Sequence, residues 1–549
     1  MPRPAAPRRA APRLVTRIPA PGPRVRRLAR PGAVLLALAL VFVVAWGTRP
    51  GPAQDAAPGG QVTAVTSVTR SCPPAAPGTA TTRISAIALP SLAAASPGTA
   101  GQGTAKLDSE KQGAATPTGA ATFAAVSSAP AASAKPPAKG NTGKAAAAKA
   151  GTAKAGTAKA AAGTRAVTVS APGTVATVTA AGGGGTAVAA TGKMAMGFEA
   201  EQTNASGTGL VSCTHPGSDM WFVGTGQSEG AQETVLYLMN TGTVTVSADL
   251  TILTDTGQQN GLSSAVTVLP NEFVAENITP YVQGSQALAL HVQATSGQVA
   301  ASVWQGGTGG GAWLPQSAAP STSLVIPGLT VASSAAKLFV VVPGGTDAQV
   351  KVVADTPAGA VAQFPGTPLD ATAGAATPVA LNSLGASAAG LRLTSSVPIV
   401  AGVLVPGTGI GSFTTAVAPV TEQGVVAGNP ATRGVTVGLL LTAPTAAARV
   451  SISVISADGT VIRPAADQAV KVAAGHTLAV SVPRPPGSGK PFAIVMAAAA
   501  GSGPVYAVRV VTSGTGGLSA PVSSLLPVPS ALASITLPAA SNSYSAVLP

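Results

Sequence analysis

Few side chains in this sequence could carry out acid–base or nucleophilic chemistry. The three histidines, His215, His291 and His476, stand far apart in the chain, whereas catalysis needs titratable groups that are held close together. One Gly-x-Ser-x-Gly match is centred on Ser228, but a strand-like run at 234–239 follows it, where a nucleophile elbow needs a helix. We therefore predict a Gly-rich turn at Ser228, with no catalytic residue, no metal site and no cofactor. The sequence favours a protein that is not an enzyme.

A group of tryptophans is the best candidate for binding a ligand. Trp221, Trp304 and Trp313 lie within one stretch of the chain, together with Tyr237 and Tyr281. Exposed aromatic rings stack on sugars or on partner proteins, whereas buried rings are common in protein cores. The three tryptophans are therefore predicted either to pack in cores or to form a ligand platform.

The two cysteines, Cys72 and Cys213, lie on either side of a long segment rich in Ala, Gly, Thr, Pro and Lys. An exported chain meets an oxidising compartment, where two cysteines most simply pair. Neither cysteine has a cluster of His or Cys around it that would suggest a metal site. We predict a structural disulfide between them, which would limit the entropy of the unfolded chain.

The tripeptide Gly-Thr-Gly recurs along the chain at a nearly constant interval. Its copies begin at residues 207, 307, 407 and 514, and an apolar run follows each of them. An interval of this size is that of a domain rather than of a solenoid repeat. No lysine and no helix signal follow the tripeptide, so a backbone turn is favoured over a phosphate cradle. The repeat predicts tandem β units.

The runs between the turns have the pattern of β-strands. Residues 243–253, for example, alternate apolar and polar side chains, which places one face in a core and the other in water. In the third unit the pattern predicts separate strands at 391–393 and 399–405. Short strands with turns between them predict an all-β fold of tandem immunoglobulin-like β-sandwich units. The predicted units cover 60–215, 216–315, 316–420 and 421–549.

The last unit includes a C-terminal strand at 544–548, which we expect to complete the unit before it. Closure of a ring through this strand is the less favoured alternative. The first unit is interrupted by an insertion at 96–165 that we predict to be disordered, because long Ala-, Gly- and Pro-rich tracts bury too little surface to fold.

Lysines recur at every fifth position of this insertion, from Lys139 to Lys159, a spacing that lines no single face of a helix. Two roles stay open for it, a solvated spacer and a cationic arm that binds an anionic cell-wall polymer. No nucleic acid is expected as a partner, because the net charge of +14 comes from this segment and from the amino terminus.

The amino terminus carries a targeting signal. Residues 1–32 form an Arg-rich tail, and residues 33–47 are an apolar run. Positive charge before an apolar run keeps the tail in the cytoplasm and directs the rest of the chain outward. The run is short for a bilayer span and also suits a signal peptide. We expect a single-pass protein of the cell membrane with an extracellular carboxyl-terminal ectodomain, or a secreted protein if the segment is cleaved.

Two patches resemble a known family. The first is Arg-Ser-Cys-Pro-Pro at 70–74, and the second is Cys213 with Pro216 and the run Trp-Phe-Val-Gly-Thr-Gly at 221–226. With its Arg-rich start and single apolar segment, the chain is similar to an actinobacterial family of membrane-anchored, secreted β-rich proteins, catalogued as domain of unknown function five-seven-one-nine. The resemblance covers most of the chain from residue 60 onward. It implies a cell-envelope location and supplies no activity and no site residues.

These features together predict a non-catalytic, exported cell-envelope protein that acts as an extracellular scaffold or interaction module. The alternative is a set of carbohydrate-binding modules for cell-wall polysaccharide or peptidoglycan, which rests on the three tryptophans and the cationic insertion. The expected partners are the membrane, through the amino-terminal segment, and anionic cell-wall polymer or other envelope proteins. An envelope hydrolase would need paired carboxylates or a nucleophile with its base, and no base can be placed beside Ser228.

Overall fold

The computed structural model describes most of the chain from residue 61 to residue 537. The predicted Arg-rich tail 1–32, the apolar segment 33–47, the C-terminal strand 544–548 and most of the insertion 96–165 lie outside the described residues. Among the residues that are described, no helix is long and apolar enough to cross a membrane. The described residues are 61–89, 120–128, 168–169, 171–204, 209–260, 265–330, 336–381, 384, 388–407, 409–421, 423–463, 469–486, 489–519, 522–531 and 534–537.

These residues fold into β-strands joined by turns and short 3-10 helices, and the described part of the chain contains no α-helix. The predicted all-β class is therefore confirmed. The chain divides into two compact units, Met1–Gln61 with Thr536–Pro549, and Val62–Ile535. Nearly all described residues belong to the second unit. The 3-10 helices are η1 (Gly192–Met194), η2 (Gln227–Glu229), η3 (Thr279–Tyr281) and η5 (Gly517–Ser519).

The first strands of the chain form two sheets. One has the order β6-β3-β8-β9, and in the other β7 lies between β2 and β4. β4 lies inside the segment 96–165, where the composition predicted disorder. It pairs with β7 through six residues and buries Phe123 completely, so these eight residues correct that prediction. The bounds are β1 (Gln61–Ala64), β2 (Ser67–Cys72), β3 (Thr81–Ile87), β4 (Ala121–Ser128), β5 (Thr168–Val169), β6 (Ala176–Ala181), β7 (Gly185–Thr191), β8 (Glu199–Asn204) and β9 (Val211–Ser212).

From β10 onward, one pattern of strand pairing occurs three times. In the first occurrence, the sheet β13-β12-β16-β10-β19, with β14 beside β12, packs against the sheet β18-β17-β11-β15. β4 continues the second of these sheets because it pairs with β15 in parallel. The bounds are β10 (Asp219–Thr225), β11 (Glu233–Asn240), β12 (Val246–Thr254), β13 (Gly257–Gln259), β14 (Val266–Val268), β15 (Glu272–Asn277), β16 (Ala287–Ser296), β17 (Ala300–Gly307), β18 (Gly310–Leu314) and β19 (Gln316–Ser317).

The second occurrence pairs β23-β22-β26-β20, with β24 beside β22, and β27-β26-β21-β25. One long strand, β26, replaces the two strands predicted at 391–393 and 399–405 and contributes to both sheets. Pro398 lies where β26 passes from one sheet to the other and has no partner in either register, so its missing N–H group costs no ladder hydrogen bond. The bounds are β20 (Ser321–Thr330), β21 (Lys337–Val341), β22 (Ala348–Thr356), β23 (Gly359–Ala362), β24 (Leu369–Ala371), β25 (Ala376–Ala380), β26 (Ala388–Val405) and β27 (Ser412–Thr415).

The third occurrence pairs β31-β30-β34-β28-β37, with β32 beside β30, and β36-β35-β29-β33. After it, β38 pairs with β1 in a two-stranded sheet. The bounds are β28 (Gln423–Asn429), β29 (Val435–Ala443), β30 (Ala448–Ile455), β31 (Val461–Ile462), β32 (Val470–Val472), β33 (His476–Val482), β34 (Phe492–Ala498), β35 (Tyr506–Ser513), β36 (Val522–Pro527), β37 (Ser530–Ala531) and β38 (Ser534–Leu537).

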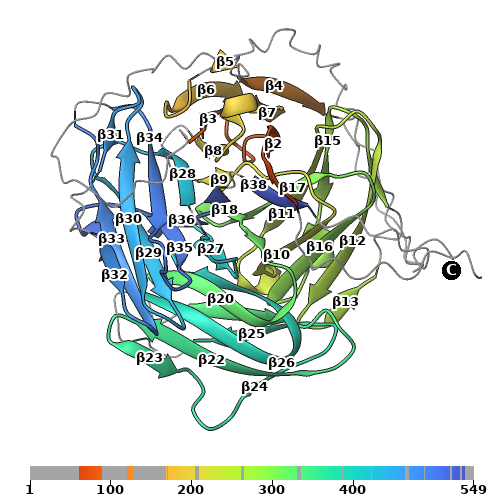
Figure 1. Ribbon diagram of the computed structural model, residues 1–549. Coiled ribbons are helices and arrows are strands. Elements are labelled where there is room, and N and C mark those ends of the chain that lie inside the picture. The colour runs from red at the N-terminus through yellow and green to blue at the C-terminus, as the bar shows by residue number, and fades with distance from the viewer. Residues whose placement is uncertain are drawn as a thin grey trace, which may run out of the picture. The chain divides into compact units, whose positions relative to one another are not determined.

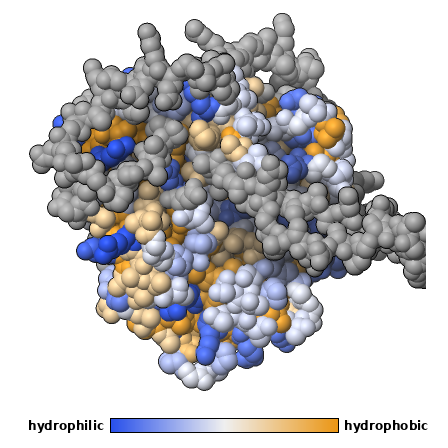
Figure 2. Space-filling model, in the orientation of Figure 1, coloured by the Kyte–Doolittle hydropathy of each residue, from blue (hydrophilic) through white to orange (hydrophobic). Residues whose placement is uncertain are grey.

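The alternating side chains account for the core of each sheet pair. On β22, Ala348, Val350 and Val352 are buried, whereas Gln349 and Lys351 between them are exposed, as the period of two requires. Buried apolar side chains from the paired sheets meet in shared clusters, and each fully buried Val or Leu contributes about 1.5–3 kcal/mol. Figure 2 shows hydrophobic residues on the surface among hydrophilic ones. This is expected for a chain in which only 9% of the residues are charged.

Within Val62–Ile535, successive sheet pairs contact each other in a circuit. β10 packs on β26, β20 packs on β29 and β35, and β28 packs on β8 and β3. The C-terminal strands therefore lie against the N-terminal ones, which Figure 1 shows as blue strands beside orange and yellow ones. This contact closes the circuit through β8 and β28, and the strand predicted at 544–548 lies outside the described residues.

Glycines allow the close approach between neighbouring sheet pairs. Gly328 and Gly428 each lie where the register of a strand shifts, β20 and β28 respectively, and both have a left-handed backbone, with φ of 57° and 71°. A Cβ atom on Gly328 would lie 2.4 Å from the Cβ atom of Leu440 on the next sheet pair. Such a bulge with glycine lets two backbones approach where no other residue fits.

Candidate binding cavity

The repeated Gly-Thr-Gly turns converge on one cavity. Gly209 and Gly309 line it directly, Ser412 lies just after the third copy, and Ser513 lies just before the fourth. The backbone is left-handed at Gly209 and Gly309, with φ of 60° and 84°, which confirms the predicted turns. The cavity has a volume of about 610 Å³, within the range of small-molecule sites. We call it the tryptophan cavity.

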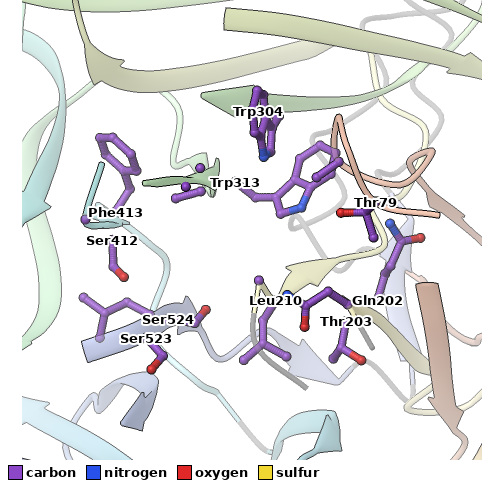
Figure 3. Close-up of a pocket in the computed structure, with 18 of the residues that line it drawn as sticks. Thr79, Gln202, Thr203, Leu210, Trp304, Trp313, Ser412, Phe413, Ser523 and Ser524 are labelled. Atoms are coloured by element: carbon purple, nitrogen blue, oxygen red, sulfur yellow. The ribbon is translucent and has the colours of Figure 1, made fainter. Parts of the chain in front are cut away.

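Two indole rings and one phenyl ring form its aromatic wall. Trp304 on β17 and Trp313 on β18 are partners in the strand register, and Phe413 on β27 joins them, as Figure 3 shows. A Cβ atom on Gly306 or Gly311 would lie 2.2 Å from the indole ring of Trp304. These two glycines therefore leave the space that the indole occupies, and this fixes how Trp304 is presented to the cavity.

Neutral polar side chains line the rest of the cavity. They come from the first strands and from the second and third occurrences of the repeated pattern, and Figure 3 shows several of them around the same space. Gln202 donates through Nε2 to the carbonyl oxygen of Pro74 at 3.3 Å, and the hydroxyl groups of Ser513 and Ser523 are 2.8 Å apart. The polar lining residues are Thr79, Thr82, Gln202, Thr203, Asn204, Ser412, Ser513, Ser523 and Ser524.

The described lining of the tryptophan cavity contains no Asp, Glu, His, Lys, Arg or Cys. A wall of this kind offers stacking surfaces and hydrogen bonds, but no general acid or base. Over the whole described part of the chain, no three His, Cys, Asp or Glu residues come together as metal ligands would.

Comparison with protein-family models assigns the chain to a family. Residues 177–483 match the family of unknown function DUF5719. The chain belongs to this family. Comparisons with curated proteins and with solved structures each find no match. The matched part of the DUF5719 chain runs from β6 to β33 and includes both tryptophans of the cavity, whereas the patch at 70–74 that carried part of the resemblance lies outside it.

In this DUF5719 chain, Trp221 lies away from the tryptophan cavity. It sits on β10, is 5% exposed, and stacks on His291 with the ring centroids 4.1 Å apart. His291 Nε2 in turn lies 3.0 Å from Asp219 Oδ1. The three tryptophans were predicted either to pack in cores or to form a ligand platform. Trp304 and Trp313, which are 8% and 7% exposed, share one cavity, whereas Trp221 packs within its own sheet.

The predicted disulfide is confirmed, since Cys72 and Cys213 are bonded. Both cysteines are buried, with exposures of 0% and 2%, in the core of the first strands. The bond links the end of β2 to the segment before β10 and joins residues 141 positions apart in the sequence.

Ser228 lies on η2 and is followed by β11 rather than by a helix, as the predicted turn requires.

Sequence reasoning missed the serines, Gln202 and Phe413 of the cavity in this DUF5719 chain. A signal was present, because Ser412 and Ser513 lie close to copies of Gly-Thr-Gly. The repeat predicted turns, but it did not show that the turns of different sheet pairs meet. That convergence depends on how the sheet pairs contact each other, and a single sequence contains no local pattern for such contacts.

Proposed function

We propose that the protein is a non-catalytic, exported protein of the cell envelope that binds a neutral saccharide in the tryptophan cavity. The observation that carries this proposal is the composition of the cavity wall. It combines two indole rings with hydroxyl and amide groups, and its described lining has no ionisable side chain. This wall favours binding without catalysis.

The two kinds of group in the wall match the two kinds of surface on a sugar ring. The C–H faces of a sugar are apolar and stack on an indole, and its hydroxyl groups both donate and accept hydrogen bonds. The indole ring of Trp304 packs closely against Gly306 and Gly311 and is 8% exposed, so little side-chain entropy is lost when a ligand stacks on it. Ser412, Ser524 and neighbouring hydroxyl groups of the lining supply partners that can donate or accept.

A neutral saccharide fits this cavity better than a charged one. A carboxylate or phosphate held there would lose hydration without a cationic partner in the described lining. The predicted binding of an anionic cell-wall polymer rests instead on the lysines of 96–165 and stays a prediction, since those lysines lie outside the described residues.

The proposed location rests on two further features. The Arg-rich tail 1–32 before the apolar run 33–47 is typical of export, either as a membrane anchor or as a cleaved signal. The Cys72–Cys213 disulfide supports an oxidising compartment outside the cytoplasm. A scaffold role among envelope proteins is compatible with both features.

We also propose that the recurring strand pairing reflects tandem domains, with the boundaries 216–315, 316–420 and 421–549. The threefold occurrence of the same strand order supports this division. The finer assignment to immunoglobulin-like sandwiches stays a prediction.

The proposal can be tested by titrating the full-length chain with neutral tetrasaccharides, such as chitotetraose and maltotetraose, and with charged tetragalacturonate. Binding is measured by calorimetry and by the emission of tryptophan. We expect a neutral saccharide to bind and to change the emission, because two indoles line the cavity, and we expect the charged one not to bind.

A variant pair at the cavity wall tests where the saccharide binds. Thr79 lines the cavity and is partly exposed, so Thr79→Trp should fill the space and abolish binding, whereas Thr79→Ser should bind as the wild type does. Neutral saccharide that binds equally well to Thr79→Trp would place its site elsewhere. Absence of binding across a wide panel of neutral glycans would overturn the proposal.

A further inference from the structure

A second cavity, of about 740 Å³, shares one lining residue, Trp313, with the tryptophan cavity. Its wall is mainly apolar, with aromatic and aliphatic side chains from the first strands, from the β10–β19 strands, from the segment after β27 and from the C-terminal strands. The side chains that form most of this wall include Phe198, Val211, Phe222, Leu314, Val417 and Leu526. We call it the Arg70 cavity.

One ion pair, between Arg70 and Glu199, lies in this mainly apolar wall. Arg70 donates through Nη2 to Glu199 Oε1 at 2.7 Å and to the carbonyl oxygen of Phe198 at 3.3 Å. Its Nε atom is buried and has no hydrogen-bond partner among the described residues. The guanidinium group therefore retains an unused donor beside the cavity that Arg70 lines.

A hydroxyl group that also lacks a hydrogen-bond partner belongs to another residue that lines this cavity. Ser317 on β19 is 6% exposed, and its Oγ atom is buried with no partner in the described part of the chain. A buried polar atom without a partner is unfavourable, and native proteins usually pair such atoms with another protein group or with an ordered water. Two such atoms on the wall of one largely apolar cavity indicate a ligand with a polar end and an apolar body.

The charges around the cavity favour an acceptor group at that polar end. Burial raises the pKa of Glu199 despite the attraction of Arg70, so this carboxyl neutralises the guanidinium less completely than an exposed one would. Burial, and after it the charge of Arg70, lower the pKa of His215, the third titratable group of the lining. The site therefore offers donors and a cation, with a neutral imidazole nearby.

We propose that the Arg70 cavity binds a long acyl chain that ends in an anionic headgroup, with the chain along the apolar wall and the headgroup at Arg70 and Ser317. The volume suits a ligand of this size, and a charge-assisted hydrogen bond from Arg70 Nε fixes the headgroup. Ala319 and Ala418 line the cavity and are exposed, so the chain enters between them. This site is separate from the saccharide site and does not depend on it.

The test uses the full-length chain and a palmitate analogue that carries a diazirine on its acyl chain. After irradiation, labelled peptides are mapped by mass spectrometry, and unlabelled palmitate, hexadecyl phosphate and hexadecanol compete for the site. We expect labels on peptides that line the Arg70 cavity. Palmitate or hexadecyl phosphate should displace the probe at least tenfold better than hexadecanol, because only an anion pairs with Arg70.

Two pairs of variants locate the chain and the headgroup. Ala319→Trp should block the entrance and reduce labelling at least fivefold, whereas Ala319→Ser should leave it unchanged. Arg70→Lys keeps the charge beside Glu199 but removes the Nε donor, so it should weaken competition by palmitate about tenfold, the effect of one charge-assisted hydrogen bond. Ser317→Ala, which removes one buried hydroxyl, serves as a second variant if Arg70→Lys unfolds.

Three results would overturn the inference. The first is labelling spread over peptides that do not line the cavity. The second is equal labelling of wild type and Ala319→Trp. The third is hexadecanol that competes as well as palmitate, which would leave an apolar site without the proposed headgroup contact. None of these results bears on saccharide binding to the tryptophan cavity.

Discussion

Arg509 donates through Nη1 to Glu201 Oε2 at 2.7 Å, although the two residues lie 308 positions apart in the sequence. Arg509 belongs to β35 and Glu201 to β8, and their side chains are 0% and 2% exposed. The same nitrogen also donates to the carbonyl oxygen of Ala427 and to Asn429 Oδ1, both at 3.1 Å. This buried ion pair thus lies at the contact that closes the circuit of sheet pairs.

Glu201 should make stability fall as pH rises. Burial raises its pKa from 4.5 to about 7, because the loss of hydration outweighs the attraction of Arg509. The folded chain therefore binds this proton more tightly than the unfolded chain. The contribution of Glu201 to stability is complete below its unfolded pKa and is lost as pH rises through about 7. When the pH is raised from below 4.5 to above about 7, the free energy of unfolding of the wild type should fall by up to a few kcal/mol relative to that of Glu201→Gln.

The measurement is denaturant unfolding of both proteins over the pH series. Asp458→Asn is the control, because hydrogen bonds from Ser456 and Thr460 lower the pKa of Asp458. The contribution of Asp458 to stability is lost only as pH falls through its lowered pKa. Asp458→Asn should therefore leave the pH dependence of stability in the neutral range unchanged. Identical pH slopes for wild type and Glu201→Gln would contradict the prediction.

Removal of one member of this ion pair should cost more than removal of both. Arg509→Met leaves the Glu201 carboxyl buried without its cation, which typically costs about 3–5 kcal/mol. The double variant Arg509→Met with Glu201→Leu buries no charge at this position, so it should unfold at higher denaturant than Arg509→Met alone. Unfolding midpoints of the wild type, both single variants and the double variant measure the coupling. A double variant less stable than Arg509→Met would show that the two losses simply add.

Much of the local structure could be predicted from the sequence. Alternation such as that of 243–253 predicts a strand because one face must be buried, and two cysteines in a chain that is expected to be exported predict Cys72–Cys213. The Gly-Thr-Gly turns were predicted because glycine tolerates the left-handed backbone observed at Gly209 and Gly309. Each of these features depends on residues that are close in sequence or on a simple count.

The partners of the strands could not be predicted. Alternation gives a strand a buried face but does not identify its neighbour, so neither β28 against β8 nor Arg509 against Glu201 follows from it. For the same reason Trp221 could not be separated from Trp304 and Trp313, because the sequence does not show which strands lie beside each of them. The single strand β26 was missed because Pro398 resembles a strand end unless the passage between two sheets is known.

Contact between the second and third sheet pairs should depend on Gly328. An alanine there would strain a backbone with φ of 57° and press its Cβ atom against Leu440 at 2.4 Å. Gly517 has nearly the same φ, 59°, but its Cβ atom would meet nothing within 4 Å. Gly517→Ala therefore reports backbone strain alone, about 1–2 kcal/mol. Gly328→Ala should lose about 1–3 kcal/mol more in denaturant unfolding, and equal losses for both variants would show that the close approach matters little.

The disulfide should contribute substantially to stability. Cys72 and Cys213 close a loop of 141 residues, and loss of such a bond typically costs about 2–5 kcal/mol because the unfolded chain gains entropy. We expect Cys72→Ser with Cys213→Ser to lower the unfolding midpoint and reduction by dithiothreitol to lower it equally in the wild type only. A reductant effect that persists in the double variant would have another cause.

Gly311 should control the tryptophan cavity through Trp304. A Cβ atom at this position would lie 2.2 Å from the indole ring, so Gly311→Ala should displace the ring into the cavity at a cost of about 1–3 kcal/mol and weaken saccharide binding. Gly183→Ala is the control, since its Cβ atom would meet nothing within 4 Å and its backbone is not left-handed. Tryptophan emission and saccharide titration of both variants check this. If Gly311→Ala shifts the emission and yet binds saccharide with unchanged affinity, Trp304 does not form part of the binding surface, and stacking must be assigned to Trp313 alone.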